Sequence, residues 1–295
     1  MLRGVFASRS PKRPNLIGVT SVKLLDRNGN ELLVEGLDAL NNTPVLDIKT
    51  ADTSLLAYEL ENNPQHKDKL RSSPRVDIRN DIHAYRTDNL MIKAAGMHGH
   101  YCPGLALGIM AACRVMNELE AESDGMEDLL AITETNNCFS DGVQYVTGCT
   151  FGNNALIFKD IGKTAFTLTH RNGKGIRVAS KPDSKQIIRE AFPDYNELYR
   201  KVIKEQNHAP ELMAAYRKTA LERAFGTLGL PFDSLFTLQQ VEVDVPPYAP
   251  VHESLFCDSC GESVMQNRTA RVDGKTLCLS CAGKKSGLLT GNGII

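Results

Sequence analysis

Two histidines and a cysteine lie within five residues in the segment MHGHYCPG, residues 97–104. Imidazole nitrogen and thiolate sulfur both suit soft or borderline metals, so His98, His100 and Cys102 could share one metal ion. In an extended chain the two histidines would point to the same side. Pro103 and the apolar run after it predict a helix that begins next to Cys102, where the helix dipole would lower the pKa of the thiol.

Two other interpretations of this cluster remain open. Cys102 could be a nucleophile, with one of the two histidines as its base. Alternatively, all three side chains could simply be packed and hydrogen-bonded. Cys113 lies inside the predicted helix and is expected to be a buried core thiol, because free cysteine behaves as a small hydrophobic residue.

Four further cysteines form a C-x2-C-x17-C-x2-C pattern near the C-terminus: Cys257, Cys260, Cys278 and Cys281. Two such pairs can complete a tetrahedral site of four sulfurs, which suits a structural Zn²⁺ and leaves no open coordination position. Asp273 and Gly274 predict a hairpin turn between the pairs, as in a zinc ribbon or treble clef. Because so short a segment cannot bury a sufficient hydrophobic core, the bound metal should supply most of the free energy of its folding.

The composition describes an ordinary globular chain. It has 295 residues, a formal net charge of −1 and 42% hydrophobic residues. That charge gives no general attraction to nucleic acid or to an anionic membrane. The first residues lack the apolar stretch of a signal peptide, and no apolar run is long enough to span a bilayer. We therefore expect a cytoplasmic protein without membrane contact, whose cysteines are ligands or free thiols.

The elements that must position these residues fall into four predicted segments. They are a strand-rich segment, a polar linker with one short helix, a mixed domain of helices and strands, and a small zinc module with a loose glycine-rich tail: residues 1–50, 51–86, 87–250 and 251–295. In the mixed domain, residues 129–135 predict a buried strand and residues 138–148 a short helix. The predicted fold class is α+β.

The segment HGHYCPGLALG, residues 98–108, resembles the first motif of the FmdE family, named for a component of formylmethanofuran dehydrogenase. Residues 138–178 resemble its second block. The resemblance implies an FmdE-like α+β core, a homodimer, and partner subunits that are molybdenum or tungsten enzymes of redox or one-carbon metabolism. It also implies one central site, which could hold a second metal besides zinc, at six positions: His98, His100, Cys102, Cys138, Asp141 and Cys149.

Residues 3–25 and 34–49 resemble the second half of a TsaA/TrmO-like domain, a β-barrel methyltransferase that uses S-adenosylmethionine to modify a tRNA adenosine. Arg9 and Arg13 are the candidate cofactor-binding residues, because a basic loop can meet phosphate or carboxylate groups. Only a partial barrel is expected here, either a remnant or the result of a truncated gene start. S-adenosylmethionine and tRNA are therefore expected partners only if the barrel is complete.

Three functions are compatible with these motifs. The first is an FmdE-like metal-binding protein, which would be an oxidoreductase component if it is enzymatic. The second is a tRNA methyltransferase fused to an FmdE-like domain. The third is a zinc-finger adaptor or regulator, suggested by five basic residues in the zinc module: Arg268, Arg271, Lys275, Lys284 and Lys285.

Overall fold

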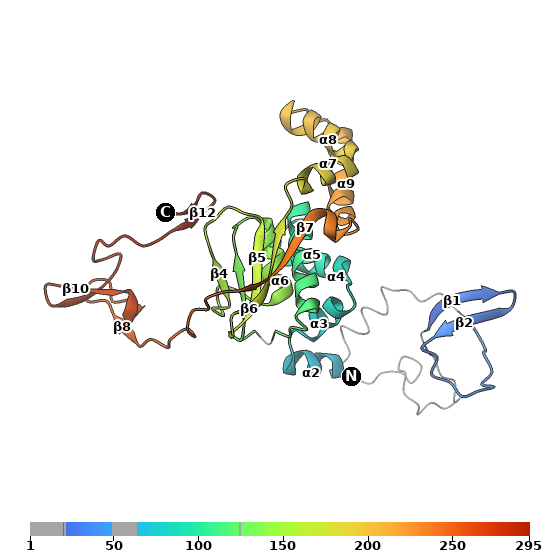
Figure 1. Ribbon diagram of the computed structural model, residues 1–295, viewed down its shortest axis with the longest axis horizontal. Coiled ribbons are helices and arrows are strands. Elements are labelled where there is room, and N and C mark those ends of the chain that lie inside the picture. The colour runs from blue at the N-terminus through green and yellow to red at the C-terminus, as the bar shows by residue number, and fades with distance from the viewer. Residues whose placement is uncertain (1–19, 21, 49–63, 124) are drawn as a thin grey trace. The chain divides into compact units, whose positions relative to one another are not determined.

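The computed structural model describes residues 20, 22–48, 64–123 and 125–295 (Figure 1). The chain divides into two compact units, residues 1–72 and residues 73–295. Within the described residues, no helix combines the length and the apolar character that crossing a membrane requires.

The first unit contains an antiparallel hairpin of β1 (Lys23–Asn28) and β2 (Glu31–Glu35), followed by helix α2 (Pro64–Ser72). Gly29 has a φ of 60° in the turn, which explains the glycine there. The predicted partial barrel is not present in the described residues of this first unit, which form the two strands β1 and β2. Two strands leave both edges open and enclose nothing, and apolar side chains such as Leu24 and Leu33 stay exposed.

A five-stranded sheet is the centre of the second unit. Its order is β4-β3-β5-β6-β7, with β3 and β4 parallel and the other pairs antiparallel. All five residues of β3 are buried, as the sequence predicts for this stretch. The strands are β3 (Leu129–Thr133), β4 (Leu156–Phe158), β5 (Ala165–His170), β6 (Lys174–Ser180) and β7 (Phe236–Glu242).

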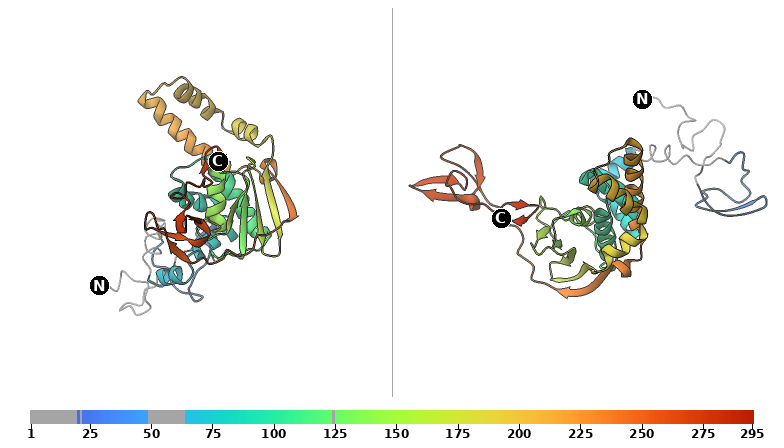
Figure 2. Two further views of the ribbon diagram at one scale, coloured as in Figure 1. Left: turned by 90° about the vertical axis from the view of Figure 1, so that its left-hand side faces the viewer. Right: turned by 90° about the horizontal axis from the view of Figure 1, so that it is seen from above.

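Helices α3 to α6 pack together, and α4, α5 and α6 lie on one face of this sheet (Figures 1 and 2). Eleven of the residues of α5 are buried, so this helix forms the middle of the core. The helices of the second unit are α3 (Val76–His83), α4 (Thr87–His98), α5 (Pro103–Glu118), α6 (Cys138–Thr147), α7 (Ser184–Ala191), α8 (Pro193–Tyr199), a π-helical turn (Arg200–Lys204), α9 (Pro210–Thr227) and α10 (Phe232–Leu235).

The described part of the predicted linker, residues 64–86, differs from expectation because it contains α2 and α3. Ile82 on α3 is buried in the core. Asp81 explains how so polar a helix is held there: it accepts hydrogen bonds from Arg86 and from Lys93 on α4, each 2.7 Å long. Burial opposes the charge of Asp81, but these hydrogen bonds keep its pKa below the ordinary value.

The C-terminal residues form three small hairpins. Strands β8 (Ser254–Phe256) and β9 (Ser263–Met265) form the first, and β10 (Thr269–Val272) and β11 (Lys275–Cys278) the second, with the predicted turn at Asp273 and Gly274. A 3-10 turn, Gln266–Arg268, connects the two. The third, β12 (Leu289–Thr290) and β13 (Gly293–Ile294), lies in the tail that the sequence predicts to be loose.

Candidate metal centres

Cys102 and Cys138 lie at the N-terminal ends of two packed helices. Cys102 is the N-cap residue of α5, and its sulfur accepts the backbone N–H of Leu105 at 3.4 Å. Cys138 is the first residue of α6, whose N-cap is Asn137. Both sulfurs therefore lie where helix dipoles and free N–H groups favour negative charge.

Glycines bring these two helix ends together. A Cβ atom on Gly108 would lie 2.1 Å from the carbonyl oxygen of Phe139, and one on Gly142 would lie 2.7 Å from that of Leu105. A Cβ on Gly104 would lie 3.0 Å from the Cβ of Cys138. Because no side chain fits at the first two positions, α5 and α6 cross backbone to backbone and place their cysteines side by side.

The two histidines reach the same place from α4, not from the extended chain that their spacing predicts. Helix α4 ends at His98, and Gly99 turns the chain with a left-handed φ of 91°. This turn brings the His98 and His100 rings to 4.4 Å between centroids. The His-Gly-His motif is thus a helix end whose glycine reverses the chain direction.

Four side chains gather their donor atoms within 4.8 Å of one another: His98, His100, Cys102 and Cys138. The His98 Nε2 atom lies 3.7 Å from the Cys102 sulfur. A tetrahedral zinc ion with one nitrogen and one sulfur ligand separates those atoms by about 3.6 Å, from the usual bond lengths. Two nitrogens and two sulfurs are also a donor set that zinc prefers. The residues present therefore fit a tetrahedral metal ion.

Asp141 orients the first of these ligands. Its Oδ2 atom lies 2.7 Å from His98 Nδ1, and its Oδ1 accepts a hydrogen bond from Gln144 at 3.1 Å. With the Nδ1 hydrogen donated to the carboxylate, the Nε2 lone pair of His98 is free and faces the cluster. Metal-binding histidines commonly have such a carboxylate partner. The resemblance included Asp141 in the site, but nothing in the sequence indicated Gln144.

The surroundings of the cluster are half-buried on one side and open on the other. Burial, and after it the nearby Cys102 sulfur, raise the pKa of the Cys138 thiol to about 11. His98, Cys102 and Cys138 are half-buried, whereas His100 is exposed. Two thiolates held this close need a cation to balance their charge, which a metal ion would supply.

Cys149, the sixth predicted site residue, does not reach this cluster. It follows Gly148, which ends α6, so it lies at the opposite end of the helix from Cys138, about 15 Å along the axis. Its sulfur donates a hydrogen bond to the Leu129 carbonyl at 3.4 Å, and burial raises its pKa to about 11. Cys113 is a core thiol, as expected. Arg9 and Arg13 lie outside the described residues.

The second cluster consists of the four C-terminal cysteines, whose sulfurs all lie within 4.8 Å of one another: Cys257, Cys260, Cys278 and Cys281. Gly261 follows the first pair with a φ of 73°, and its N–H donates to the Cys257 carbonyl at 2.9 Å. The Cys257 sulfur accepts the backbone N–H of Cys278 at 3.3 Å. N–H groups from Cys260 and Cys278 lower the Cys257 pKa to about 6, which favours the thiolate that zinc binds. Two hairpins without an α-helix make a ribbon-like module.

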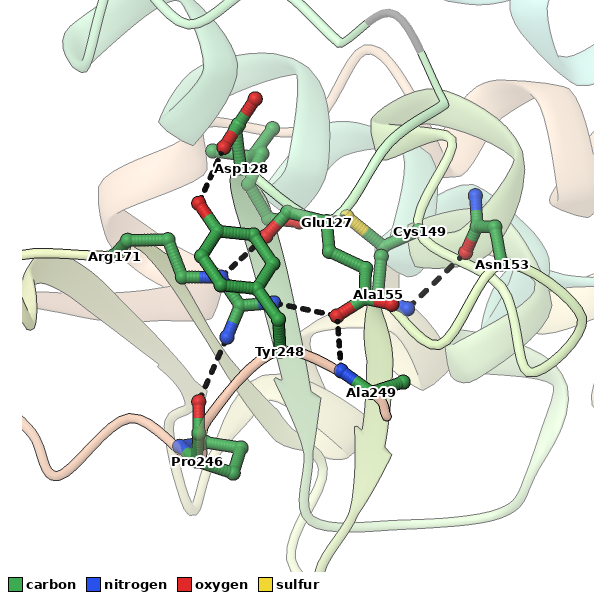
Figure 3. Close-up of polar contacts among 10 residues, drawn as sticks. Glu127, Asp128, Cys149, Asn153, Ala155, Arg171, Pro246, Tyr248 and Ala249 are labelled. Carbon is green, nitrogen blue, oxygen red and sulfur yellow. Dashed lines mark hydrogen bonds and ion pairs between the residues drawn. The ribbon is translucent and has the colours of Figure 1, made fainter. Parts of the chain in front are cut away.

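Arg171 binds the segment between β7 and the zinc module through hydrogen bonds and a cation–π contact (Figure 3). Arg171 donates hydrogen bonds to the Glu127 carbonyl, the Glu127 carboxylate and the Pro246 carbonyl, at 2.6, 2.8 and 2.7 Å. Its guanidinium group lies 3.9 Å from the centre of the Tyr248 ring, whose hydroxyl donates to Asp128. The chain that leads to the zinc module is therefore fixed against the sheet domain.

The tail hairpin makes two hydrogen bonds with the loops that follow β3 and β4. Asn136, two residues before Cys138, donates to the Thr290 carbonyl at 2.7 Å. Asp160 accepts the backbone N–H of Ile294 at 2.8 Å. The tail thus contains a hairpin whose strand residues pair and whose backbone is hydrogen-bonded to side chains of the sheet domain.

Three protein families match parts of the chain. The profile described as FmdE, molybdenum formylmethanofuran dehydrogenase operon, matches residues 97–237. The tRNA-methyltransferase O N-terminal domain matches residues 2–52. The prokaryotic dksA/traR C4-type zinc finger matches residues 253–287. The first two matches confirm the two family resemblances found in the sequence, and the third confirms the zinc finger predicted from the spacing of the four cysteines.

A probable S-adenosyl-L-methionine-binding protein of Archaeoglobus fulgidus is 39% identical over 99% of this chain and 76% of its own length. A second A. fulgidus protein, an S-adenosyl-L-methionine-binding protein, is 55% identical over 47 residues, which are 16% of this chain and 34% of that protein. The solved structure of a tungsten formylmethanofuran dehydrogenase FmdE-like protein from Syntrophus aciditrophicus is 22% identical. It covers 67% of this chain and 92% of its own, with a TM-score of 0.43.

Proposed function

Because the chain belongs to a family of FmdE-domain proteins with a TrmO-type N-terminal segment and a C4 zinc finger, we propose that it is a metal-binding component of molybdenum- or tungsten-dependent redox or one-carbon metabolism. Its central site binds one metal ion through His98, His100, Cys102 and Cys138. The observation that carries the proposal is the convergence of these four donors beside the His98–Asp141 hydrogen bond.

Each ligand has a distinct structural role in this proposal. Asp141 fixes the ring of His98, and the two helix ends fix Cys102 and Cys138. His100 follows the Gly99 turn and is exposed, so it is the ligand that most easily leaves and opens a coordination position. A metal ion with such a position supplies Lewis-acid chemistry. The closed four-cysteine site is structural.

Metal analysis of the purified chain tests the site. Wild-type protein should contain two metal ions per chain, and Cys102→Ser should contain one. His100→Gln should lose the central metal more readily during dialysis. His83→Gln is the matched control, because His83 is also an exposed histidine at a helix end but lies outside both clusters. Full metal content in Cys102→Ser would show that the ligands are assigned wrongly.

The metabolic part of the proposal rests on the family to which the FmdE segment belongs, and it has its own test. Expressed with candidate molybdenum or tungsten enzyme subunits, the full chain should co-purify with one of them, and Cys102→Ser should lose that association or its effect on activity. No association with any such subunit, and unchanged enzyme activity without this chain, would contradict it.

A second candidate function is S-adenosylmethionine binding, with tRNA adenosine methylation as the associated activity. It is favoured by the match of residues 2–52 and by the A. fulgidus relative. A pocket for such a cofactor must bury most of its surface. The described hairpin of residues 23–35 is exposed on both faces and does not enclose a ligand by itself. Equilibrium dialysis of the full chain against labelled S-adenosylmethionine decides this candidate, which absence of retained label would exclude.

A further inference from the structure

The sulfurs of Cys102 and Cys138 both lie close to the position where Gly104 lacks a side chain. The position that a Cβ of Gly104 would occupy is 3.8 Å from each of them. Glycine leaves that position free, so no side chain separates the two sulfurs, which are within 4.8 Å of one another. Both cysteines are half-buried and thus open to small solutes on one side.

The other cysteines of the chain differ from this pair, and all eight lie within the described residues. Cys113 and Cys149 are buried, and each sulfur donates to a backbone carbonyl, of Ile82 and Leu129 respectively. Neither belongs to a group of potential metal ligands. The remaining four form the zinc finger, where a closed shell of ligands would occupy every sulfur. Cys102 and Cys138 therefore differ from the other cysteines, because their sulfurs lie close together, are partly exposed to solvent and are not part of the zinc finger.

The chain segments that carry the two sulfurs allow them to approach. Cys102 is an N-cap residue with an extended backbone, φ −152° and ψ 159°, outside the regular turns of α5. Cys138 is the first residue of α6, and its side chain is not enclosed by a preceding turn. Rotation about the Cα–Cβ bonds moves each sulfur, and a disulfide requires the two sulfurs to approach to about 2.05 Å. The Gly108–Gly142 crossing keeps the helix ends that carry them side by side.

We propose that Cys102 and Cys138 are a redox modification site: when the metal is absent, hydrogen peroxide converts them to a reversible disulfide. One thiolate attacks a peroxide oxygen, the O–O bond breaks, and the departing oxygen leaves as water after protonation. The other thiol then displaces hydroxide from the resulting sulfenic acid, and its proton leaves with that hydroxide as a second water. Two thiols are oxidised to one disulfide, and one hydrogen peroxide is reduced to two waters. The product is the same whichever sulfur reacts first.

This modification has a consequence for the central site that rests on the proposed function. Disulfide formation removes both sulfur ligands and leaves His98 and His100 alone. Two imidazoles without the thiolates bind zinc far more weakly than a complete set. Oxidation thus prevents metal binding, and a bound metal in turn occupies both sulfurs and protects them from oxidation.

Mass spectrometry of the full chain tests the disulfide. Chelator-treated and metal-loaded samples are exposed to an equimolar amount of hydrogen peroxide, alkylated and digested. The chelator-treated chain should yield a peptide pair joined through Cys102 and Cys138, which dithiothreitol separates. The metal-loaded chain should yield less of it. In Cys138→Ser, Cys102 should instead stop at a sulfenic acid that dimedone traps, and Cys113→Ala should still form the cross-link.

Two results would overturn the proposal: recovery of both cysteines as alkylated thiols, or oxidation of Cys102 to the sulfinic acid in wild type without any cross-link. Failure of the metal proposal is a different result. If the wild-type chain binds no central metal but still forms the cross-link, the disulfide stands and the metal site does not. If it binds the metal but never forms the cross-link after chelation, the reverse holds.

Discussion

Replacing Asp141 with asparagine tests how the central ligands are oriented. The Asp141 carboxylate lies 2.7 Å from His98 Nδ1 and fixes the ring so that Nε2 faces the cysteines. Asparagine keeps the volume but removes the charge, and its amide can donate to Nδ1 and favour the wrong tautomer. Changing such a carboxylate typically weakens metal binding by about 10–100-fold. Because 37% of the Asp141 side chain is exposed and water screens it, we expect about tenfold, or about 1.4 kcal/mol.

Competition with a chromogenic chelator measures this change in zinc affinity. The zinc-finger metal, which Asp141 does not contact, supplies an internal reference in every titration. Gln144→Ala should have a smaller effect, because Gln144 bonds only to the other carboxylate oxygen of Asp141. An Asp141→Asn chain that holds its central zinc as tightly as wild type would refute the claim that His98 is a ligand oriented by this carboxylate.

Three further predictions concern the scaffold. Gly108→Ala should lower the free energy of unfolding by about 1–3 kcal/mol in chemical denaturation, because its Cβ would lie 2.1 Å from a backbone oxygen; unchanged stability would contradict the close helix crossing. Arg171→Ala should lower the free energy of unfolding by about 2 kcal/mol and expose residues 245–251 to limited proteolysis. An uncut segment would show that the Arg171 contacts do not hold these residues in place. Arg177 donates to both Glu134 oxygens and lowers the Glu134 pKa below its ordinary 4.5. The stability from this pair is therefore present above pH 4.5 and lost as pH falls through the folded pKa, and Arg177→Gln should remove that part of the acid dependence in pH-resolved melting curves.

Elements with strong local signals could be predicted from the sequence. The run of four apolar residues in β3, the turn before Lys174 between β5 and β6, and the helix that Gly148 ends all have patterns that do not depend on distant residues. The zinc finger is of the same kind, because four cysteines at fixed spacing define their own geometry.

The missed features depend on tertiary contacts. Helix α3 looks like polar linker because its stability comes from Asp81 bonds to residues further along the chain. Gly108 and Gly142 are ordinary helix glycines until the two helices are placed together. For the same reason the sequence could not show that Cys138, at the start of α6, belongs to the cluster whereas Cys149, just beyond the other end of α6, does not.

X-ray absorption spectroscopy of the zinc-loaded full chain tests the central claim most directly. A finger with four sulfurs and a central site with two sulfurs and two nitrogens predict, averaged over both zinc ions, three sulfurs and one nitrogen per zinc. In Cys257→Ser, if the finger loses its metal, the remaining zinc should show two sulfurs and two nitrogens. A wild-type spectrum with four sulfurs per zinc, and no metal left in Cys257→Ser, would mean that zinc binds only the finger and that the His-Gly-His cluster is not a zinc site.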